Sequence, residues 1–148
     1  MHRIDWKSLA VEALQAYPAR RASLDSIPEE IRMLDDRMTV PRGGSADATP
    51  VREGGNRYEE RLLTDLARKG ELERALERAT VETKRVEAAM KGLNDEQRLL
   101  LDRFYMHRTK DYIDRLCEET GYERTQVYKR KDDALHEFTL RLYGVVEL

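Results

Sequence analysis

The sequence predicts an all-α protein in which an N-terminal helical hairpin or coiled-coil arm precedes a C-terminal helix-turn-helix. Three observations predict this fold class. Apolar residues recur at spacings of three and four along most of the chain, the period of one helix face. Charged residues make up 38% of the 148 residues and aromatic residues only 7%, a balance typical of long solvated helices and not of a β-sandwich. Gly121 and Gly144 follow apolar helical stripes, where a helix would end.

Two short helices are expected in the first 38 residues. Residues 5–17 have one broad apolar face, and we expect Pro18 to end that helix because proline lacks the N–H that an interior position needs. Spacings of three and four then predict a second helix over residues 24–38, with Pro28 tolerated in its first turn. Its stripe consists of Leu24, Ile27, Ile31, Leu34 and Met38.

Residues 39–56 contain two prolines, four glycines and small polar residues, so we expect a flexible loop there. Residues 57–91 contain no proline and predict a helix long enough to form a coiled-coil arm, with a kink or break at Gly70 as one option. Its seam can pair with the stripe of residues 24–38 or with a second copy of the chain, and both alternatives stay open. The seam consists of Leu62, Leu66, Leu72, Leu76, Ala79, Thr83, Val86, Met90 and Leu93. Residues 1–92 therefore form one predicted region, which serves oligomerisation or contact with RNA polymerase.

Residues 93–148 form the second predicted region, which begins with a strong helix start. Asn94 can cap a helix and Gln97 can complete a capping box, so a helix is expected to run to about His107. Thr109 is expected to cap the next helix, residues 110–120, which Gly121 closes. The last helix is expected over residues 124–143, before Gly144.

The spacing of Cys117, Gly121 and Val127 is typical of a helix-turn-helix. Two helices can cross closely when the first offers a small side chain, the turn offers a glycine, and the second points an apolar residue back. Cys117 is therefore interpreted as a small core residue and not as a redox sensor. The start of the second helix would then point outward, toward base edges in the major groove.

The candidate DNA-binding residues lie in two groups. Those expected at base edges are Arg124, Thr125, Gln126, Tyr128 and Lys129, and the positive run Lys129, Arg130 and Lys131 can neutralise phosphates. A second basic group before the helix-turn-helix includes Arg108 and Lys110. Because the net charge of the whole chain is −2, any DNA contact must come from such a local patch.

Composition and motifs argue against several other classes of protein. No apolar run reaches 18 residues and the first six residues lack a signal-peptide stretch, so no membrane partner is expected. The single cysteine excludes an internal disulfide and fits a reducing cytoplasm. The histidines lack metal-ligand spacing, the glycine pairs lack a P-loop lysine, and no catalytic triad or carboxylate pair is evident. We therefore expect no enzyme, cofactor or metal.

Beyond these patterns, the C-terminal region resembles region 4 of bacterial sigma factors. The resemblance rests on Leu93-x-x-Glu96, Phe104-Tyr105, Leu116-Cys117-Glu118-Glu119-Thr120-Gly121, Thr125-x-Val127 and Ala134-Leu135. Cys117 replaces the family's usual alanine, and Glu123 replaces its serine or threonine cap. No counterpart of sigma region 2 is recognisable, so a stand-alone sigma factor is not expected.

With the N-terminal half included, the chain is similar to phage regulators of the ArpU/RinA type. The resemblance rests on "LNDEQRLLLDRFYMHR", "TGYERTQVYKRKDDAL" and the terminal "LYG". It implies a transcriptional activator of phage late, packaging or structural genes, working in the cytoplasm of a bacterial host.

Three functions are thus open from the sequence. The first is a sequence-specific transcription regulator that binds double-stranded DNA, forms a homo-oligomer and has RNA polymerase as a further candidate partner. The second is a small terminase subunit that recognises packaging DNA. The third is a coiled-coil adaptor that binds RNA polymerase without DNA contact.

Overall fold

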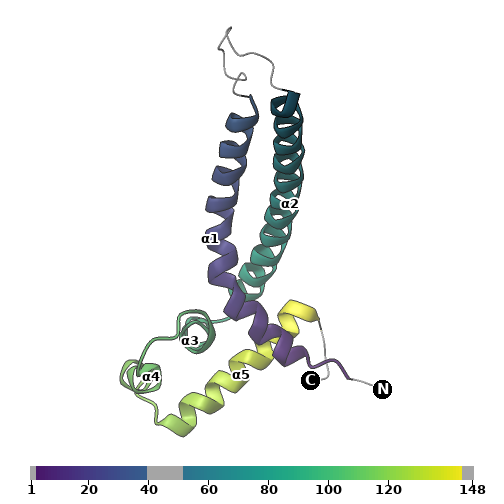
Figure 1. The fold of residues 1–148 in the computed structure, drawn as a ribbon. Helices are drawn as coiled ribbons and strands as arrows, with labels where there is room; N and C mark the ends of the chain where they lie inside the picture. Colours follow the sequence, from purple (N-terminus) through teal and green to yellow (C-terminus); the bar gives the residue numbers. More distant parts are fainter. Residues whose placement is uncertain (1–2, 40–51, 145–148) are drawn as a thin grey trace. The chain divides into compact units, whose positions relative to one another are not determined.

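The computed structural model describes residues 3–39 and 52–144, with side chains described from residue 57 in the second range. Within these ranges the structure is helical and contains no strand, which confirms the all-α class (Figure 1). The elements are α1 (Trp6–Thr39), α2 (Arg52–Lys91), α3 (Asp95–Leu101), η1 (Asp102–Met106), α4 (Tyr112–Thr120) and α5 (Arg124–Tyr143). No helix in the described ranges has an apolar stretch long enough to cross a bilayer.

The two helices expected before residue 39 are a single helix, α1, so the prediction that Pro18 ends the first helix is wrong. An interior proline removes one backbone hydrogen bond and costs about 3 kcal/mol. Contacts with α2 hold α1 on both sides of Pro18 and offset that cost. The Tyr17 hydroxyl donates to Glu87 at 2.8 Å just before the proline, and Arg37 pairs with Asp65 well after it.

The expected loop over residues 39–56 is shorter than predicted. Thr39 still belongs to α1, and α2 already begins at Arg52, so residues 52–56 are helical despite two glycines. Each glycine costs about 1 kcal/mol in a helix, but extending an existing helix is far easier than starting one. Residues 40–51 lie outside the described residues. α2 also runs through Gly70 without a break.

Residues Ala22–Ala79 form one compact unit, in which α1 and α2 run side by side and antiparallel (Figure 1). The predicted seam is wrong at one position, because Asp65 is buried while Leu66 is 49% exposed. Asp65 and Lys69 continue the three–four spacing from Leu62, and charged partners on α1 make their inward placement possible. Arg37 Nε donates to Asp65 Oδ2 at 3.0 Å, and Lys69 Nζ lies 2.7 Å from Asp35 Oδ1.

A second compact unit combines residues Met1–Arg21 with Thr80–Leu148. It therefore does not coincide with the region expected to start at residue 93, since the start of α1 and the end of α2 contribute to its core. The core cluster contains Ala10, Ala13, Leu14, Val86, Ala89, Leu93, Leu101, Ala134, Leu135 and Phe138. Trp6 adds an aromatic contact with Tyr143, with ring centroids 5.0 Å apart.

The start of α3 has the predicted capping box. Asn94 Oδ1 accepts from the Gln97 N–H at 2.8 Å, and Gln97 Oε1 accepts from the Asn94 N–H at 3.0 Å. The helix continues into η1, where wider π-type turns end with the His107 N–H donating to the Asp102 carbonyl at 2.7 Å.

The start of α4 differs from the prediction, whereas α5 has the predicted bounds. Thr109 does not cap α4; Asp111 precedes it in the left-handed conformation with φ of 60°, which aspartate tolerates better than most residues. Gly121 ends α4 with φ of 77°, and its N–H donates to the Cys117 carbonyl at 2.9 Å. Gly144 ends α5 in the same conformation, with φ of 67°.

Candidate nucleic-acid interface

The candidate interface is built on the packing of α4 against α5. A core cluster of Leu100, Phe104, Ile113, Leu116 and Val127 joins α3, η1, α4 and α5. Leu116 and Val127 have no exposed surface, and Cys117 packs partly buried beside them. Residues 121–123 connect the two helices, and the Tyr122 N–H donates to Thr120 Oγ1 at 3.3 Å in this turn. The start of α5 is therefore held firmly against α4.

Four exposed side chains, Arg124, Thr125, Tyr128 and Lys129, follow one another along the start of α5 and are called the α5 stripe below. They occupy positions i, i+1, i+4 and i+5, which lie together on one side of a helix. Gln126 is exposed as well, but two residues are more than half a helical turn, so it lies away from Arg124. Gln126 instead lies next to the other edge of the stripe, because it comes three residues before Lys129.

Arg124 opens the α5 stripe and pairs with α4. Its Nη2 donates to Asp114 Oδ1 at 2.9 Å. That hydrogen bond and the charge of Asp114 raise the pKa of Arg124, so the guanidinium stays fully charged.

Tyr128 links the stripe to the second basic group through Phe104. The Phe104 ring meets Tyr128 and Tyr112 edge to face, with centroids 5.6 Å and 5.2 Å away. The Arg108 guanidinium lies over Tyr112 at 4.6 Å from its centroid, and Arg108 Nε donates to the Phe104 carbonyl at 3.2 Å. Arg108 and Tyr128 thus border the same aromatic cluster, although they are distant in sequence.

Arg130, which the sequence suggested as a phosphate contact, has partners within the protein, and 40% of its side chain is exposed. Its Nη1 donates to Glu96 Oε2 at 3.0 Å, and its guanidinium lies 4.3 Å from the centre of the Tyr122 ring. The Tyr122 hydroxyl donates to the other oxygen of Glu96 at 2.6 Å. Arg130 therefore connects α5 to the start of α3.

Lys131 is also a structural residue, since only 15% of its side chain is exposed. Its Nζ lies 5.2 Å from the centre of the Phe104 ring and 2.6 Å from Asp132 Oδ1. Burial alone would lower the pKa of Lys131, but the hydrogen bond with Asp132 and the influence of Tyr105 outweigh it and raise that pKa. Of the expected run of three phosphate-binding cations, Arg130 and Lys131 thus have partners within the protein, whereas Lys129 is exposed and has no ion pair to the described residues.

Between residues 107 and 144, three exposed lysines and arginines have no side-chain hydrogen bond or ion pair to the described residues. They are Lys110, Arg115 and Lys129. Arg115 is not among the site residues predicted from the sequence, and it follows Asp114 on the exposed side of α4. Helical spacing could have identified it, because Ile113 and Leu116 point inward and leave residue 115 outside.

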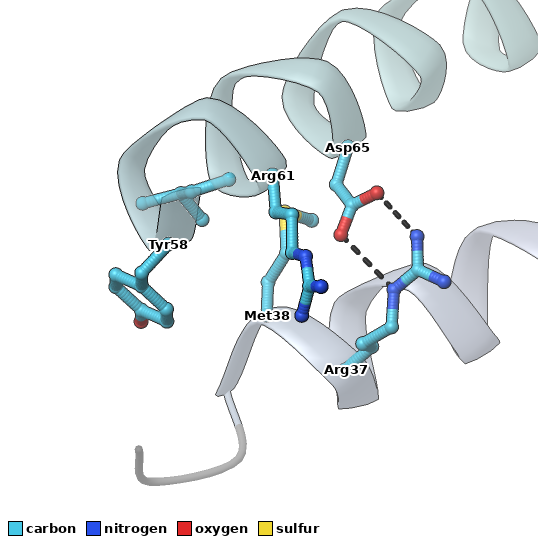
Figure 2. Close-up of a pocket in the computed structure, with 6 residues that line it drawn as sticks. Arg37, Met38, Tyr58, Arg61 and Asp65 are labelled. Carbon is cyan, nitrogen blue, oxygen red and sulfur yellow. Dashed lines mark hydrogen bonds and ion pairs between the residues drawn. The ribbon is translucent and has the colours of Figure 1, made fainter. Parts of the chain in front are cut away.

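A separate hollow of about 410 Å³ lies in the other compact unit, where Arg37 and Met38 of α1 approach Tyr58, Arg61, Leu62 and Asp65 of α2 (Figure 2). Figure 2 shows the two hydrogen bonds between Arg37 and Asp65 on its wall and Arg61 beside Met38. The polar side chains of its wall are those of the Arg37–Asp65 ion pair, Tyr58 and Arg61. In the described part of the chain, no three His, Cys, Asp or Glu side chains are grouped to hold a metal.

Comparison of the chain with protein-family models, characterised proteins and solved structures finds no match.

Proposed function

We propose that this protein is a sequence-specific DNA-binding transcription regulator whose α5 stripe enters the major groove of double-stranded DNA. The observation that carries the proposal is the stripe itself. An exposed arginine, threonine, tyrosine and lysine share one side of a helix whose other side is fixed by Val127 and Ala134 in two cores. The major groove admits an α-helix, and the first residues of such a helix contact base edges.

Each side chain of the stripe has chemistry that suits DNA. Arginine can bind guanine with two hydrogen bonds, the threonine methyl can contact a thymine methyl, and the lysine can neutralise a phosphate. Arg108, Lys110 and Arg115 add positive charge before and along α4. Because the whole chain is slightly acidic, the interface would be confined to this side of the molecule.

The biological setting follows from the resemblance to phage regulators of the ArpU/RinA type and remains part of the proposal. In that setting the protein activates late or packaging genes of a phage or prophage in the host cytoplasm. The proposal includes a homo-oligomer, which Leu63 and Leu66 support because both are exposed on α2. RNA polymerase is the proposed partner of the helical hairpin.

The test measures binding to the DNA upstream of the protein's own operon and to unrelated DNA at several salt concentrations. Arg124→Ala should weaken specific binding by about 5- to 150-fold, as expected when one bidentate base contact is lost. Lys129→Ala should weaken binding to all sequences alike and reduce the salt slope by about one. Arg78→Ala and Lys84→Ala on α2 are matched controls, since both side chains are exposed outside the candidate interface.

Absence of salt-dependent DNA binding by the wild type would overturn the proposal, and capture of RNA polymerase by the same protein would then favour an adaptor. Light scattering on the DNA-free protein separates a regulator from a terminase subunit. A dimer fits a regulator, whereas a ring of many subunits fits a protein that recognises packaging DNA.

A further inference from the structure

Asp114 stands out because it places a carboxylate beside the first residue of the proposed DNA-contacting helix. Asp114 lies in the first turn of α4, and Arg124 is the first residue of α5. Their side chains are 62% and 66% exposed and are joined by the 2.9 Å hydrogen bond. Exposed pairs of this kind add little to folding stability, so the pair needs another explanation.

The geometry of the guanidinium supplies one. Arginine carries five N–H donors in a planar fork, and the hydrogen bond to Asp114 uses one on Nη2. The second N–H on Nη2 remains free, and together with the neighbouring N–H on Nη1 or on Nε it can make the two parallel hydrogen bonds that guanine O6 and N7 accept. Asp114 can therefore hold Arg124 while the arginine binds a base.

Electrostatics favour the same arrangement. An unpaired carboxylate at this place would repel the phosphates of approaching DNA, whereas Asp114 paired with Arg124 is neutralised. The pairing also restricts a long side chain before DNA arrives, which lowers the entropy lost on binding.

We infer that Asp114 is a positioning residue for Arg124, and that the pair makes guanine the preferred base where Arg124 contacts the DNA. This inference rests on the proposed function and adds the base that the site selects. It gives Asp114 an effect on specificity that is separate from folding and from general affinity.

The experiment first selects the preferred site from randomised double-stranded DNA with the full-length wild-type protein. Binding is then measured to that site and to each single-base variant of it. Arg124→Ala should abolish a guanine preference at one position, a loss on the order of tenfold or more. Asp114→Ala should reduce the preference at the same position by about two- to tenfold, the effect of releasing one long side chain.

Three further variants separate positioning from other effects. Asp114→Asn keeps an oxygen acceptor and should retain part of the preference. Asp133→Ala removes a carboxylate from an exposed position of α5 and should leave the preference unchanged. In the Arg124→Ala background, Asp114→Ala should have no additional effect on base preference. Thermal unfolding of all variants should match that of the wild type.

The possible failures differ from one another. A wild type that binds no DNA overturns the proposed function and this inference together. A wild type that binds specifically, with base preference unaltered by Asp114→Ala, overturns only the positioning role. A change at a base that Arg124→Ala does not affect also overturns it, because Asp114 would then contact a cytosine amino group itself.

Discussion

The guanidinium of Arg130 and the hydroxyl of Tyr122 bond to the two oxygens of a single carboxylate, that of Glu96. The guanidinium also lies 4.3 Å from the centre of the Tyr122 ring. Glu96 belongs to α3, Tyr122 to the turn after α4, and Arg130 to α5. One side chain thus connects the three segments that fix the orientation of the proposed DNA-contacting helix.

Glu96→Ala should lower the free energy of unfolding by about 1–3 kcal/mol, because it leaves the partly buried Arg130 without its partner. Asp95→Ala is the matched control, since Asp95 lies in the same helical turn but pairs with Arg98 at the surface. That change should cost less than about 1 kcal/mol. Urea unfolding measures the free energy of unfolding of both variants. Equal losses would show that the contacts of Glu96 stabilise the protein no more than the surface ion pair of Asp95.

Lys131→Ala should mainly lower stability, whereas Lys129→Ala should mainly weaken DNA binding, although the two residues are close in sequence. Lys131 packs on the Phe104 ring, so its removal should destabilise the protein by about 1 kcal/mol and leave the salt dependence of DNA binding unchanged. Removal of the exposed Lys129 should change stability by less than about 0.5 kcal/mol. Thermal unfolding and DNA binding at several salt concentrations are measured for both variants. A reduced salt slope for Lys131→Ala would contradict the structural role of Lys131.

Features governed by local rules could be predicted from the sequence. The capping box of Asn94 and Gln97, the left-handed Gly121 and both ends of α5 are as expected, because each depends on residues within one or two helical turns. The buried positions Val127, Ala134 and Phe138 also agree with the apolar stripe of the last helix.

Features governed by partners distant in sequence could not be predicted. The length of α1 depends on contacts with α2 that outweigh Pro18, and the inward position of Asp65 depends on Arg37. In the candidate interface too, features set by neighbours in sequence could be predicted and those set by distant partners could not. Helical spacing could predict that Arg124 and Lys129 are exposed, but not that Glu96 engages Arg130 or that aromatic rings cover Lys131.

The unit that contains α5 should lose stability at alkaline pH. The hydrogen bond to Glu96 and burial raise the pKa of Tyr122 above 10.0, and the contacts of Lys131 raise its pKa above 10.5. In both cases the folded state holds its proton more tightly, so the stabilisation is complete below pH 10 and is lost as the pH rises through the folded pKa values. Urea unfolding between about pH 8 and pH 11 should show this fall.

Tyr122→Phe is the control for the alkaline effect, because it removes one of the titrating groups without removing the ring under Arg130. Its stability should depend less steeply on pH above about 10 than that of the wild type. Identical slopes for the two proteins would mean that Tyr122 does not contribute.

Asp65 offers a test of the seam between α1 and α2. Asp65→Leu should stabilise the hairpin by about 1 kcal/mol or more, because it replaces a buried carboxylate by an apolar side chain in a helical seam and leaves the exposed Arg37 guanidinium in contact with water. Arg37→Ala should destabilise it, since Asp65 is then buried without its partner. Chemical unfolding measures the change in the free energy of unfolding for both variants. A loss of stability in Asp65→Leu would indicate that the ion pair itself stabilises the hairpin.

Pro18→Ala should raise the stability of the protein, which distinguishes one continuous α1 from two helices that meet at the proline. In a continuous helix the alanine restores the N–H that can donate to the Leu14 carbonyl and removes a penalty of about 3 kcal/mol. The greater freedom of the unfolded chain returns up to about 1 kcal/mol of that gain. A net gain of about 2 kcal/mol corresponds to a rise in melting temperature of roughly 4–8 °C for a chain of this size.

If the first helix ended at residue 17, the alanine would restore no hydrogen bond. The greater freedom of the unfolded chain would then be the remaining effect, and it would lower the stability of the protein. An unchanged or lowered melting temperature, measured by circular dichroism, would therefore contradict the continuous helix.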